Sequence, residues 1–292
     1  MKRTNSTLPA AGRGQTAPRS FEALRDVVAA GHAGLPKRLA QAAHYALAHP
    51  DEIALGTAAS IAASADVQPS TLVRLAQHLG YDGFSGFQAV FRDRLKSRAS
   101  TYEERLRKIE IGAGGDSYES ALLNGFLTAA RRSIDTVSES IDAGEFARCV
   151  SVLAAADTIY LVARRRAYPL AAHMAYAFAK LRIRSVTVDS PNGIDAEVVE
   201  MATPKDAAIA CSFAPYAPAT VEQARALTEL GVPLVAITDS ALSPLAACAT
   251  HWLEVAETDF AGFRSLSASM ALAVALPVAV AERRRYQLKA RG

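Results

Sequence analysis

The amino-acid sequence predicts an α + α/β protein: an all-helical region, then a doubly wound domain with a five-stranded parallel sheet in three α/β/α layers. Two observations predict this division. From Phe21 to about Arg98, apolar residues recur at helical spacing and no segment alternates like a strand. From about Ala147 onward, β-branched apolar runs alternate with helical segments, which is typical of a parallel sheet covered on both faces. A charged, then glycine-rich stretch, 99–117, is predicted to link the two regions.

The composition is that of a packed protein long enough for two domains. Of the 292 residues, 50% are hydrophobic and 21% are charged, which supports a core and argues against general disorder. The net charge of +3 is too small by itself to indicate a nucleic-acid binder. Residues 1–19 are basic and contain no acid, so we expect a disordered leader there. The folded domains are expected at 20–98 and 118–292.

The cysteines and apolar runs bear on the compartment. The three cysteines are isolated and form no C-x-x-C motif, which is typical of reduced thiols. The leader has no apolar centre like that of a signal peptide. The longest apolar run, 268–281, is interrupted by Pro277 and is shorter than the roughly 20 residues of a membrane span. These features predict a soluble cytoplasmic protein without a membrane partner.

The helical region is predicted to hold several short helices. Ser20 is expected to cap a first helix that stops at Gly31. The next helix, within "LPKRLAQAAHYALAHP", is expected to end at Pro50. Two short helices, "TAASIAASA" and "PSTLVRLAQHLG", follow, separated by 66–68, and a further helix starts near Phe84.

The two short helices have helix-turn-helix spacing. Ala62 is small enough for a close helix crossing, and Asp66 in the turn tolerates a left-handed backbone. Val67, Leu72, Leu75 and Leu79 are expected to fill the core. Polar residues that remain outside could reach bases and phosphates from the major groove: Gln68, Ser70, Thr71, Arg74, Gln77 and His78. Lys37, Arg38 and Arg92 are candidate phosphate contacts. The same pattern also fits a small helical bundle with a solvated polar face.

The second region begins with a helix from about Tyr118 to Ile141. The apolar runs predicted as strands are Thr158–Ala163, Arg184–Val188, Ala207–Phe213, Val232–Thr238 and Trp252–Val255. The helices predicted between and after them are Pro169–Leu181, Asp195–Met201, Thr220–Leu230, a short one after Ser243, and Arg264 to about Arg284. Thr220 with Gln223 reads as a capping box, and Ser243-Pro244 reads as a cap followed by proline at the first helical position.

At this level of detail the chain resembles a known family. "LPKRLAQAAHYALAHPDEI…IAASADVQPSTLVRLAQHLGYDGFSGFQ" resembles the helix-turn-helix domain of RpiR-type bacterial transcriptional regulators, over roughly 20–98. Residues 147–285, including "ITDSALSPLA", resemble the sugar isomerase (SIS) domain that follows it in these regulators. The resemblance implies binding to a double-stranded DNA operator and a homodimer or homotetramer. It also implies control by a small anionic metabolite bound in the SIS domain.

The chain departs from the family at both phosphate-binding loops. The first loop usually reads Gly-x-Gly-x-Ser, and here the matching residues are Ala163, Arg165 and Ala167. The second usually reads Ser-x-Ser-Gly-x-Thr, and here "SFAPYA" keeps only Ser212. Glycines let backbone N–H groups approach a phosphate and hydroxyls donate further hydrogen bonds, so that cradle is missing. The resemblance therefore implies an effector pocket, for a sugar phosphate or a related carbohydrate-derived metabolite.

Three consecutive arginines occupy the first loop, where a guanidinium could replace the backbone cradle. The alternative is that they pair with Asp189, Asp195 or Glu197, or lie at a subunit interface. Buried tyrosines that only find a hydrogen bond, and a turn role for the serine after the second strand, are likewise open alternatives. The candidate effector residues are Arg165, Arg166, Tyr168, Ser190, Ser212 and Tyr216.

The sequence predicts no catalytic constellation, no cofactor and no metal site. The histidines lack metal-ligand spacing, and there is no nucleophile elbow. By the resemblance, an isomerase would need a general base, and nothing marks Glu197 or Glu200 as one. We therefore expect a regulator. The rival readings are a sugar-phosphate isomerase with a helical appendage, and a regulator whose SIS domain serves only for assembly.

Overall fold

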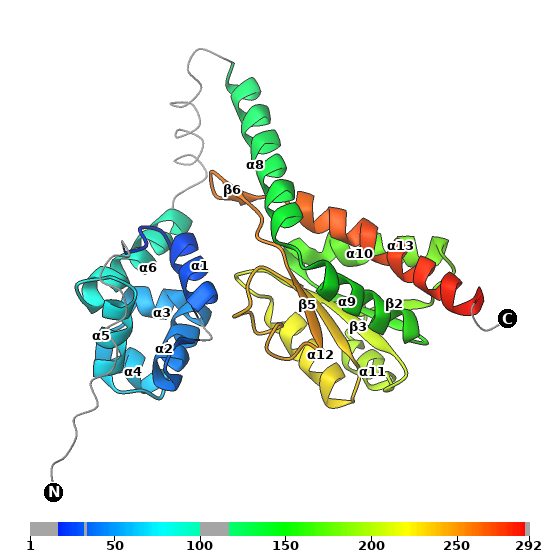
Figure 1. Ribbon diagram of the computed structural model, residues 1–292, viewed down its shortest axis with the longest axis horizontal. Coiled ribbons are helices and arrows are strands. Elements are labelled where there is room, and N and C mark those ends of the chain that lie inside the picture. Colours follow the sequence, from blue (N-terminus) through cyan, green and yellow to red (C-terminus); the bar gives the residue numbers. More distant parts are fainter. Residues whose placement is uncertain (1–16, 32–33, 100–116, 290–292) are drawn as a thin grey trace, which may run out of the picture. The chain divides into compact units, whose positions relative to one another are not determined.

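The computed structural model describes residues 17–31, 34–99 and 117–289. The chain divides into two compact units, Met1–Thr101 and Tyr102–Gly292, both drawn in Figure 1. The predicted leader, up to residue 16, and the predicted linker, from 100 to 116, lie outside the described residues. At the end of the predicted leader, Pro18 is buried, and its carbonyl oxygen accepts a 2.8 Å hydrogen bond from the Tyr81 hydroxyl. That part of the leader therefore packs on the helical unit.

The first unit is built of short helices, as its spacing predicts. Ser20 caps the first of them, because its Oγ accepts a 3.1 Å hydrogen bond from the amide of Ala23. Pro50 does not simply end the second helix: it opens a further short helix that the sequence did not indicate. The described helices of this unit are α1 (Phe21–Gly31), α2 (Lys37–Ala48), α3 (Pro50–Leu55), α4 (Ala58–Ser64), α5 (Pro69–His78) and α6 (Phe84–Ala99).

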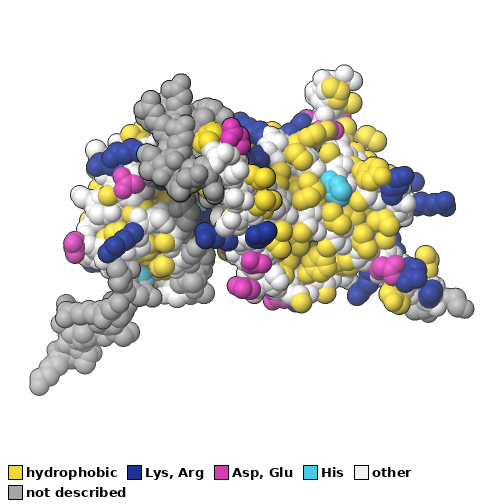
Figure 2. Space-filling model, turned by 90° about the horizontal axis from the view of Figure 1, so that it is seen from above, with side chains coloured by type: hydrophobic (Ala, Val, Ile, Leu, Met, Phe, Trp, Pro, Cys, Tyr) yellow, Lys and Arg dark blue, Asp and Glu magenta, His cyan; other side chains and the backbone are white. Residues whose placement is uncertain are grey.

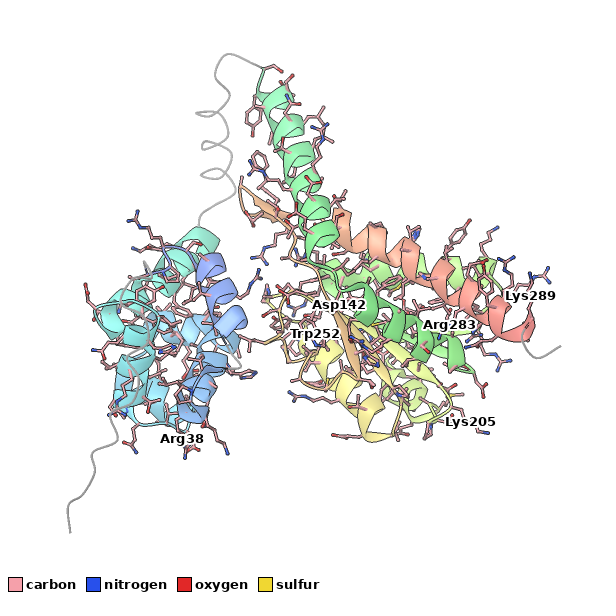
Figure 3. All side chains as sticks on the ribbon, in the orientation of Figure 1. Arg38, Asp142, Lys205, Trp252, Arg283 and Lys289 are labelled. Atoms are coloured by element: carbon pink, nitrogen blue, oxygen red, sulfur yellow. The ribbon has the colours of Figure 1, made fainter. Side chains whose placement is uncertain are left out.

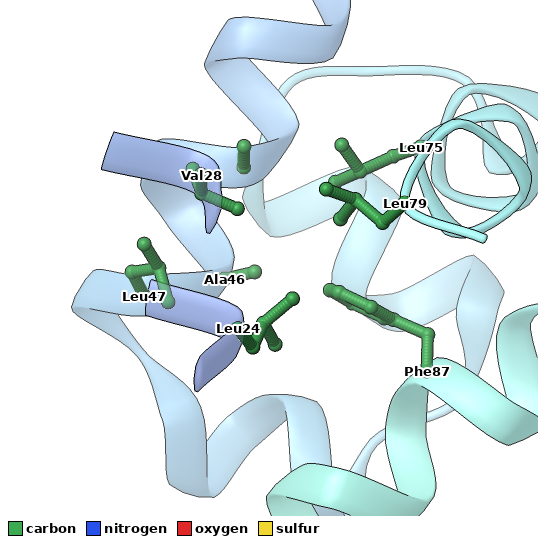
Figure 4. A pocket seen from close by; sticks show the side chains of 8 residues that line it. Leu24, Val28, Ala46, Leu47, Leu75, Leu79 and Phe87 are labelled. Carbon is green, nitrogen blue, oxygen red and sulfur yellow. The ribbon is translucent and has the colours of Figure 1, made fainter. Parts of the chain in front are cut away.

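The core of the helical unit gathers side chains from α1, α2, α5 and α6. Leu24, Leu75 and Phe87 are fully buried, and the Phe87 ring lies 4.9 Å from that of Phe91. A small apolar gap remains at the centre, as Figure 4 shows. It is lined by Leu24, Val28, Ala43, Ala46, Leu47, Leu75, Leu79 and Phe87. Recognition-helix residues thus help to hold the whole unit together.

The second unit contains the predicted five-stranded parallel sheet, with strand order β2-β1-β3-β4-β5. The three central strands are buried along their whole length, which explains their unbroken apolar sequences. The strands are β1 (Ile159–Ala163), β2 (Ser185–Thr187), β3 (Ala207–Cys211), β4 (Leu234–Thr238) and β5 (His251–Glu254).

Helices cover both faces of this sheet (Figure 1). One core cluster joins the sheet to α9, α10 and α13, and the other joins it to α11 and α12. Successive β1 residues alternate between the clusters, Leu161 facing the first and Val162 the second. The described helices are α8 (Tyr118–Ser140), α9 (Ala143–Ala155), α10 (Tyr168–Lys180), α11 (Asp195–Glu200), α12 (Pro218–Glu229) and α13 (Ser267–Lys289). No helix in these described ranges has the length and apolarity needed to cross a membrane.

Several predicted details of this unit are wrong. Thr220 does not cap α12, because Pro218 already occupies the first turn and the helix starts earlier. The segment after Ser243 is a series of turns rather than a helix, although the Ser243 Oγ does accept a hydrogen bond from the amide of Leu245. Arg264 does not start the last helix. It belongs to a hairpin of two short strands, β6 (Asp259–Phe260) and β7 (Phe263–Arg264).

Candidate DNA-reading helix and effector site

The helix-turn-helix has the turn and the core that its spacing predicts. Asp66 takes a left-handed backbone conformation, with φ of 50°. Thr57 and Ser60 form a reciprocal capping box at the start of α4. Ala62, Leu72, Leu75 and Leu79 are buried, and Val67 is partly buried. The two helices therefore cross on a tightly packed apolar face.

The opposite face of α5 carries the predicted DNA contacts. Gln68 is the amino-terminal cap residue, but its side chain makes no capping hydrogen bond, and Pro69 fills the first helical position. The polar groups around this helix end are thus open to a ligand. Thr71 is partly buried, whereas the following side chains are exposed: Gln68, Ser70, Arg74, Gln77 and His78.

The predicted phosphate contacts differ in what they touch. Lys37 is exposed. Arg38 also projects from the surface of the helical unit (Figure 3), but its guanidinium donates to the Asp66 carbonyl oxygen at 3.1 Å and to Oε1 of Gln41 at 3.0 Å. Arg92 donates from Nε to the Ala54 carbonyl oxygen at 3.1 Å. Arg38 therefore braces the turn and Arg92 braces α3, whatever further contacts they make.

The candidate effector site lies where the winding of the sheet reverses. β1 and β3 are neighbours, with Ala163 opposite Cys211. The helix after β1 covers one face of the sheet and the helix after β3 covers the other. Open α/β sheets bind ligands at such a switch point, beyond the carboxyl ends of the strands. The loops 164–168 and 212–217 form its two sides.

The first arginine of the cluster has a protein partner. Arg164 forms an ion pair and hydrogen bond with Asp195 at the start of α11. The other carboxylate oxygen of Asp195 accepts a 2.7 Å hydrogen bond from the amide of Ser190. For Arg164 the alternative reading, pairing with an acid, is therefore confirmed. Asp195 ties the loop after β1 to the loop after β2.

The second arginine occupies the position of the missing second glycine. Arg165 has φ of 54°, in the left-handed region that glycine adopts without cost. Its side chain is exposed. It opens a short 3-10 helix, η2 (Arg165–Ala167), that leads into α10. The loop therefore keeps a glycine-like backbone without the glycine.

The third arginine turns inward. The Arg166 guanidinium lies over the Phe213 ring, 5.4 Å from its centroid. Burial, and next the positive charge of Arg264, lower the pKa of Arg166. Among the described residues, no acid lies within ion-pair distance of it and no group accepts a hydrogen bond from it. Arg166 is thus a half-buried cation at the switch point whose donors are not used by the protein.

The other candidates lie around this point without meeting in one cluster. Tyr168 is exposed, and the Asp189 carboxylate raises its pKa by accepting its hydrogen bond. The Ser190 Oγ accepts the amide of Asn192, which is the predicted turn role. The Ser212 hydroxyl is buried and accepts the amide of Ala217 at 3.1 Å. Tyr216 packs against the cluster on the α11–α12 face.

Sequence reasoning missed two residues that shape the site. Asp239, after β4, accepts a 3.0 Å hydrogen bond from the amide of Ala214. Arg264 donates to the carbonyl oxygen of the same Ala214, also at 3.0 Å. A hairpin signal was present around Arg264, since "DFAGFR" places a two-residue loop ending in Gly262 between aromatic residues.

The acids suggested for an isomerase role are not arranged as a general base. Glu197 and Glu200 are exposed on α11. Glu257, after β5, is occupied, because Oε1 accepts the amide and hydroxyl of Ser269 and Oε2 accepts the Ser265 hydroxyl. Within the described part of the chain, no three His, Cys, Asp or Glu side chains are grouped to hold a metal ion.

Comparisons with known proteins agree with both units. A family model described as a helix-turn-helix domain of the rpiR family matches residues 29–98, and the SIS domain model matches residues 152–279. Together these domains define a transcriptional regulator with a SIS module. The chain belongs to the RpiR-type regulators. No curated protein sequence matches it.

Solved structures share this fold at low identity. The Vibrio vulnificus NanR protein complexed with ManNAc-6P is 18% identical and covers 90% of this chain and 92% of its own, with a TM-score of 0.52. The sugar isomerase domain of an RpiR transcription factor from Sphaerobacter thermophilus is 22% identical, covers 56% of this chain and 92% of its own, and has a TM-score of 0.52. An Escherichia coli protein, solved as a complex with its ligand, is 19% identical, covers 59% and 94%, and has a TM-score of 0.51.

Proposed function

We propose that this protein is a cytoplasmic DNA-binding transcriptional regulator that dimerises and responds to a small anionic metabolite. The observation that carries the DNA-binding part is the exposed polar face of α5, held by a buried leucine face beneath it. In a two-fold dimer, two such helices would enter successive major grooves about 34 Å apart. The proposed domains are residues 20–98 for DNA and 118–292 for effector binding and assembly.

Arg74 is the proposed base-reading residue with the largest effect. Replacing Arg74 with alanine is expected to weaken binding to the cognate operator about ten- to a hundredfold, because a bidentate arginine–base contact is worth about 1–3 kcal/mol. The operator is first selected from a random duplex library with the wild-type protein. Affinity is then measured by fluorescence anisotropy at fixed salt.

The matched control for this experiment is Arg225→Ala, which removes one exposed arginine from α12 of the other unit. It should bind like wild type. If Arg74→Ala binds the operator as tightly as Arg225→Ala, α5 is not the reading helix. An equal loss in both variants would indicate a general charge effect and would also reject the assignment.

We propose that an apolar surface on α10 and α13 is covered by a second copy of the chain. Figure 2 shows hydrophobic side chains gathered over this part of the second unit. Tyr176 on α10 is 62% exposed, and Val274 and Val278 on α13 are exposed on one helical stripe. The apolar run 268–281 has no charged residue, and a helix that is apolar all round is normally buried. A regulator that reads two half-sites needs such a contact.

A charge placed in this surface should break the dimer. Val278→Glu is expected to shift the protein toward monomer, because a carboxylate would have to be buried without a partner. The mass is measured by light scattering after size exclusion. Met201→Glu, at an exposed apolar position after α11, is the control and should keep the wild-type mass. A Val278→Glu protein with the wild-type mass would contradict the assignment.

The effector is proposed to bind beyond the carboxyl ends of β1 and β3. The unused donors of Arg166 at the switch point support an anion there, with Arg165, Tyr168, Ser190, Ser212 and Tyr216 as candidate contacts. The related NanR structure complexed with ManNAc-6P supports a sugar phosphate or similar metabolite as the ligand. Such a ligand would control transcription by binding one arrangement of the dimer more tightly than another.

A further inference from the structure

The β6–β7 hairpin brings a second arginine to the effector site. Arg264 is 50 residues after Ala214 in the sequence, yet its Nη1 donates a 3.0 Å hydrogen bond to the Ala214 carbonyl oxygen in the loop after β3. Its Nε lies 3.6 Å from Oδ2 of Asp259 on the paired strand. Among the described residues, nothing accepts a hydrogen bond from its Nη2. One edge of this guanidinium is fixed and the other is available.

The hairpin is held firmly enough to position this arginine. Phe260 and Phe263 both pack edge-on against Phe126 of α8, with ring centroids 5.1 Å and 6.1 Å away. The Phe260 ring also lies directly over Gly125, where a side chain would collide with it. Figure 1 shows β6 beside α8. Arg264 is thus preorganised by contacts on the side away from the sheet.

Arg166 and Arg264 are close enough to repel each other, which is unfavourable unless something between them is negative. The Arg264 charge is the largest electrostatic contribution lowering the pKa of Arg166. Three acids attract Arg166 from a distance, namely Asp239, Glu257 and Asp259. Each already accepts hydrogen bonds: Asp239 from Ala214, Glu257 from Ser269, and Asp259 from the amide of Gly262. The protein therefore does not complete the hydrogen bonding of this pair of cations.

We propose that Arg264 is a second anion-recognition residue, and that with Arg166 it clamps an oxyanion of two charges, such as a phosphate monoester. This inference rests on the effector site proposed above and adds a residue and a ligand charge to it. Two guanidinium groups replace the glycine-and-hydroxyl cradle that the loops lack. The planar donors suit phosphate oxygens, and a dianion neutralises both cations at once.

Inorganic phosphate is the probe for this proposal, measured by calorimetric titration and by the rise in melting temperature at constant ionic strength, with chloride as the reference salt. Wild type should bind phosphate. Arg166→Ala and Arg264→Ala should each weaken binding about tenfold or more, as expected for loss of a charge-assisted hydrogen bond. Arg184→Ala removes an exposed arginine just before β2, at the opposite end of the strands, and should bind like wild type.

A second variant separates recognition from bracing of the loop. In Arg264→Gln the side-chain amide can still donate to the Ala214 carbonyl oxygen, but the charge is gone. The unliganded protein should therefore melt at or near the wild-type temperature while phosphate binding still falls about tenfold. This result supports a direct role for the Arg264 charge.

The outcomes distinguish this inference from the function on which it rests. If Arg166→Ala loses phosphate but Arg264→Gln binds like wild type, Arg264 is only a brace, and the inference fails while the effector site stands. If wild type does not bind phosphate at all, the anionic effector site fails, and the clamp with it. A loss in Arg184→Ala equal to that in Arg264→Gln would reduce the effect to net charge and would also overturn the clamp.

Discussion

Replacing Leu75 with alanine is expected to lower the free energy of unfolding of the helical unit by about 2–5 kcal/mol. Leu75 is fully buried and already borders the apolar gap between α1, α2, α5 and α6. Removing its side chain enlarges that gap, and the surrounding helices cannot all collapse into it because Leu24 and Phe87 pack from other helices. For a small unit, this is a large fraction of the total stability.

The measurement is urea unfolding followed by far-ultraviolet circular dichroism, with the operator affinity determined on the same samples. Val73→Ala on the same helix is the control, because that side chain is partly exposed and should cost much less. Leu75→Ala should bind the operator more weakly as temperature rises, in step with unfolding of α5. A Leu75→Ala protein as stable as Val73→Ala would show that α5 does not rest on this core.

Replacing Gly125 with alanine is expected to displace the β6–β7 hairpin and to destabilise the α/β unit by about 1–3 kcal/mol. A Cβ at this position would lie 2.0 Å from the Cζ atom of Phe260 and 2.6 Å or less from two more ring atoms. The ring cannot swing freely, because it also packs edge-on against Phe126. The hairpin that carries Arg264 must therefore move away from α8.

This change has two readouts. Thermal unfolding should report the lost packing, and titration with inorganic phosphate should report weaker binding if the hairpin positions Arg264. Asn124→Ala is the matched control, since it changes the neighbouring exposed position of α8 and should leave both values unchanged. Wild-type stability in Gly125→Ala would mean that the hairpin tolerates a side chain there and is not docked on this glycine.

The sheet and the helix-turn-helix were predictable because their signals are local. Buried strands such as β1 and β3 are apolar along their length, and the turn at Asp66 follows from its spacing and chemistry. α9 was overlooked although its start carries a legible signal. Asp142 accepts a 2.8 Å hydrogen bond from the amide of Glu145, and an aspartate followed three residues later by glutamate indicates a helix start.

The missing parts of the site depend on contacts between distant segments. β6 and β7 are two residues each, too short for any periodicity, and their position is set by Gly125 and Phe126 more than 130 residues earlier. Likewise, the sequence showed three arginines but not their division of labour. Only the position of Asp195 separates Arg164, which closes the loops, from Arg166, which faces Phe213.

The left-handed backbone at Arg165 has a consequence for how this family could diversify its ligands. A non-glycine residue in that conformation costs about 1 kcal/mol, yet the loop keeps it because β1 and α10 fix both of its ends. The course of the main chain is therefore inherited from the scaffold rather than from the residue that sits there. Side chains along this rim can change their charge without changing the outline of the cavity mouth. Shape and ligand preference become separate variables on which selection can act.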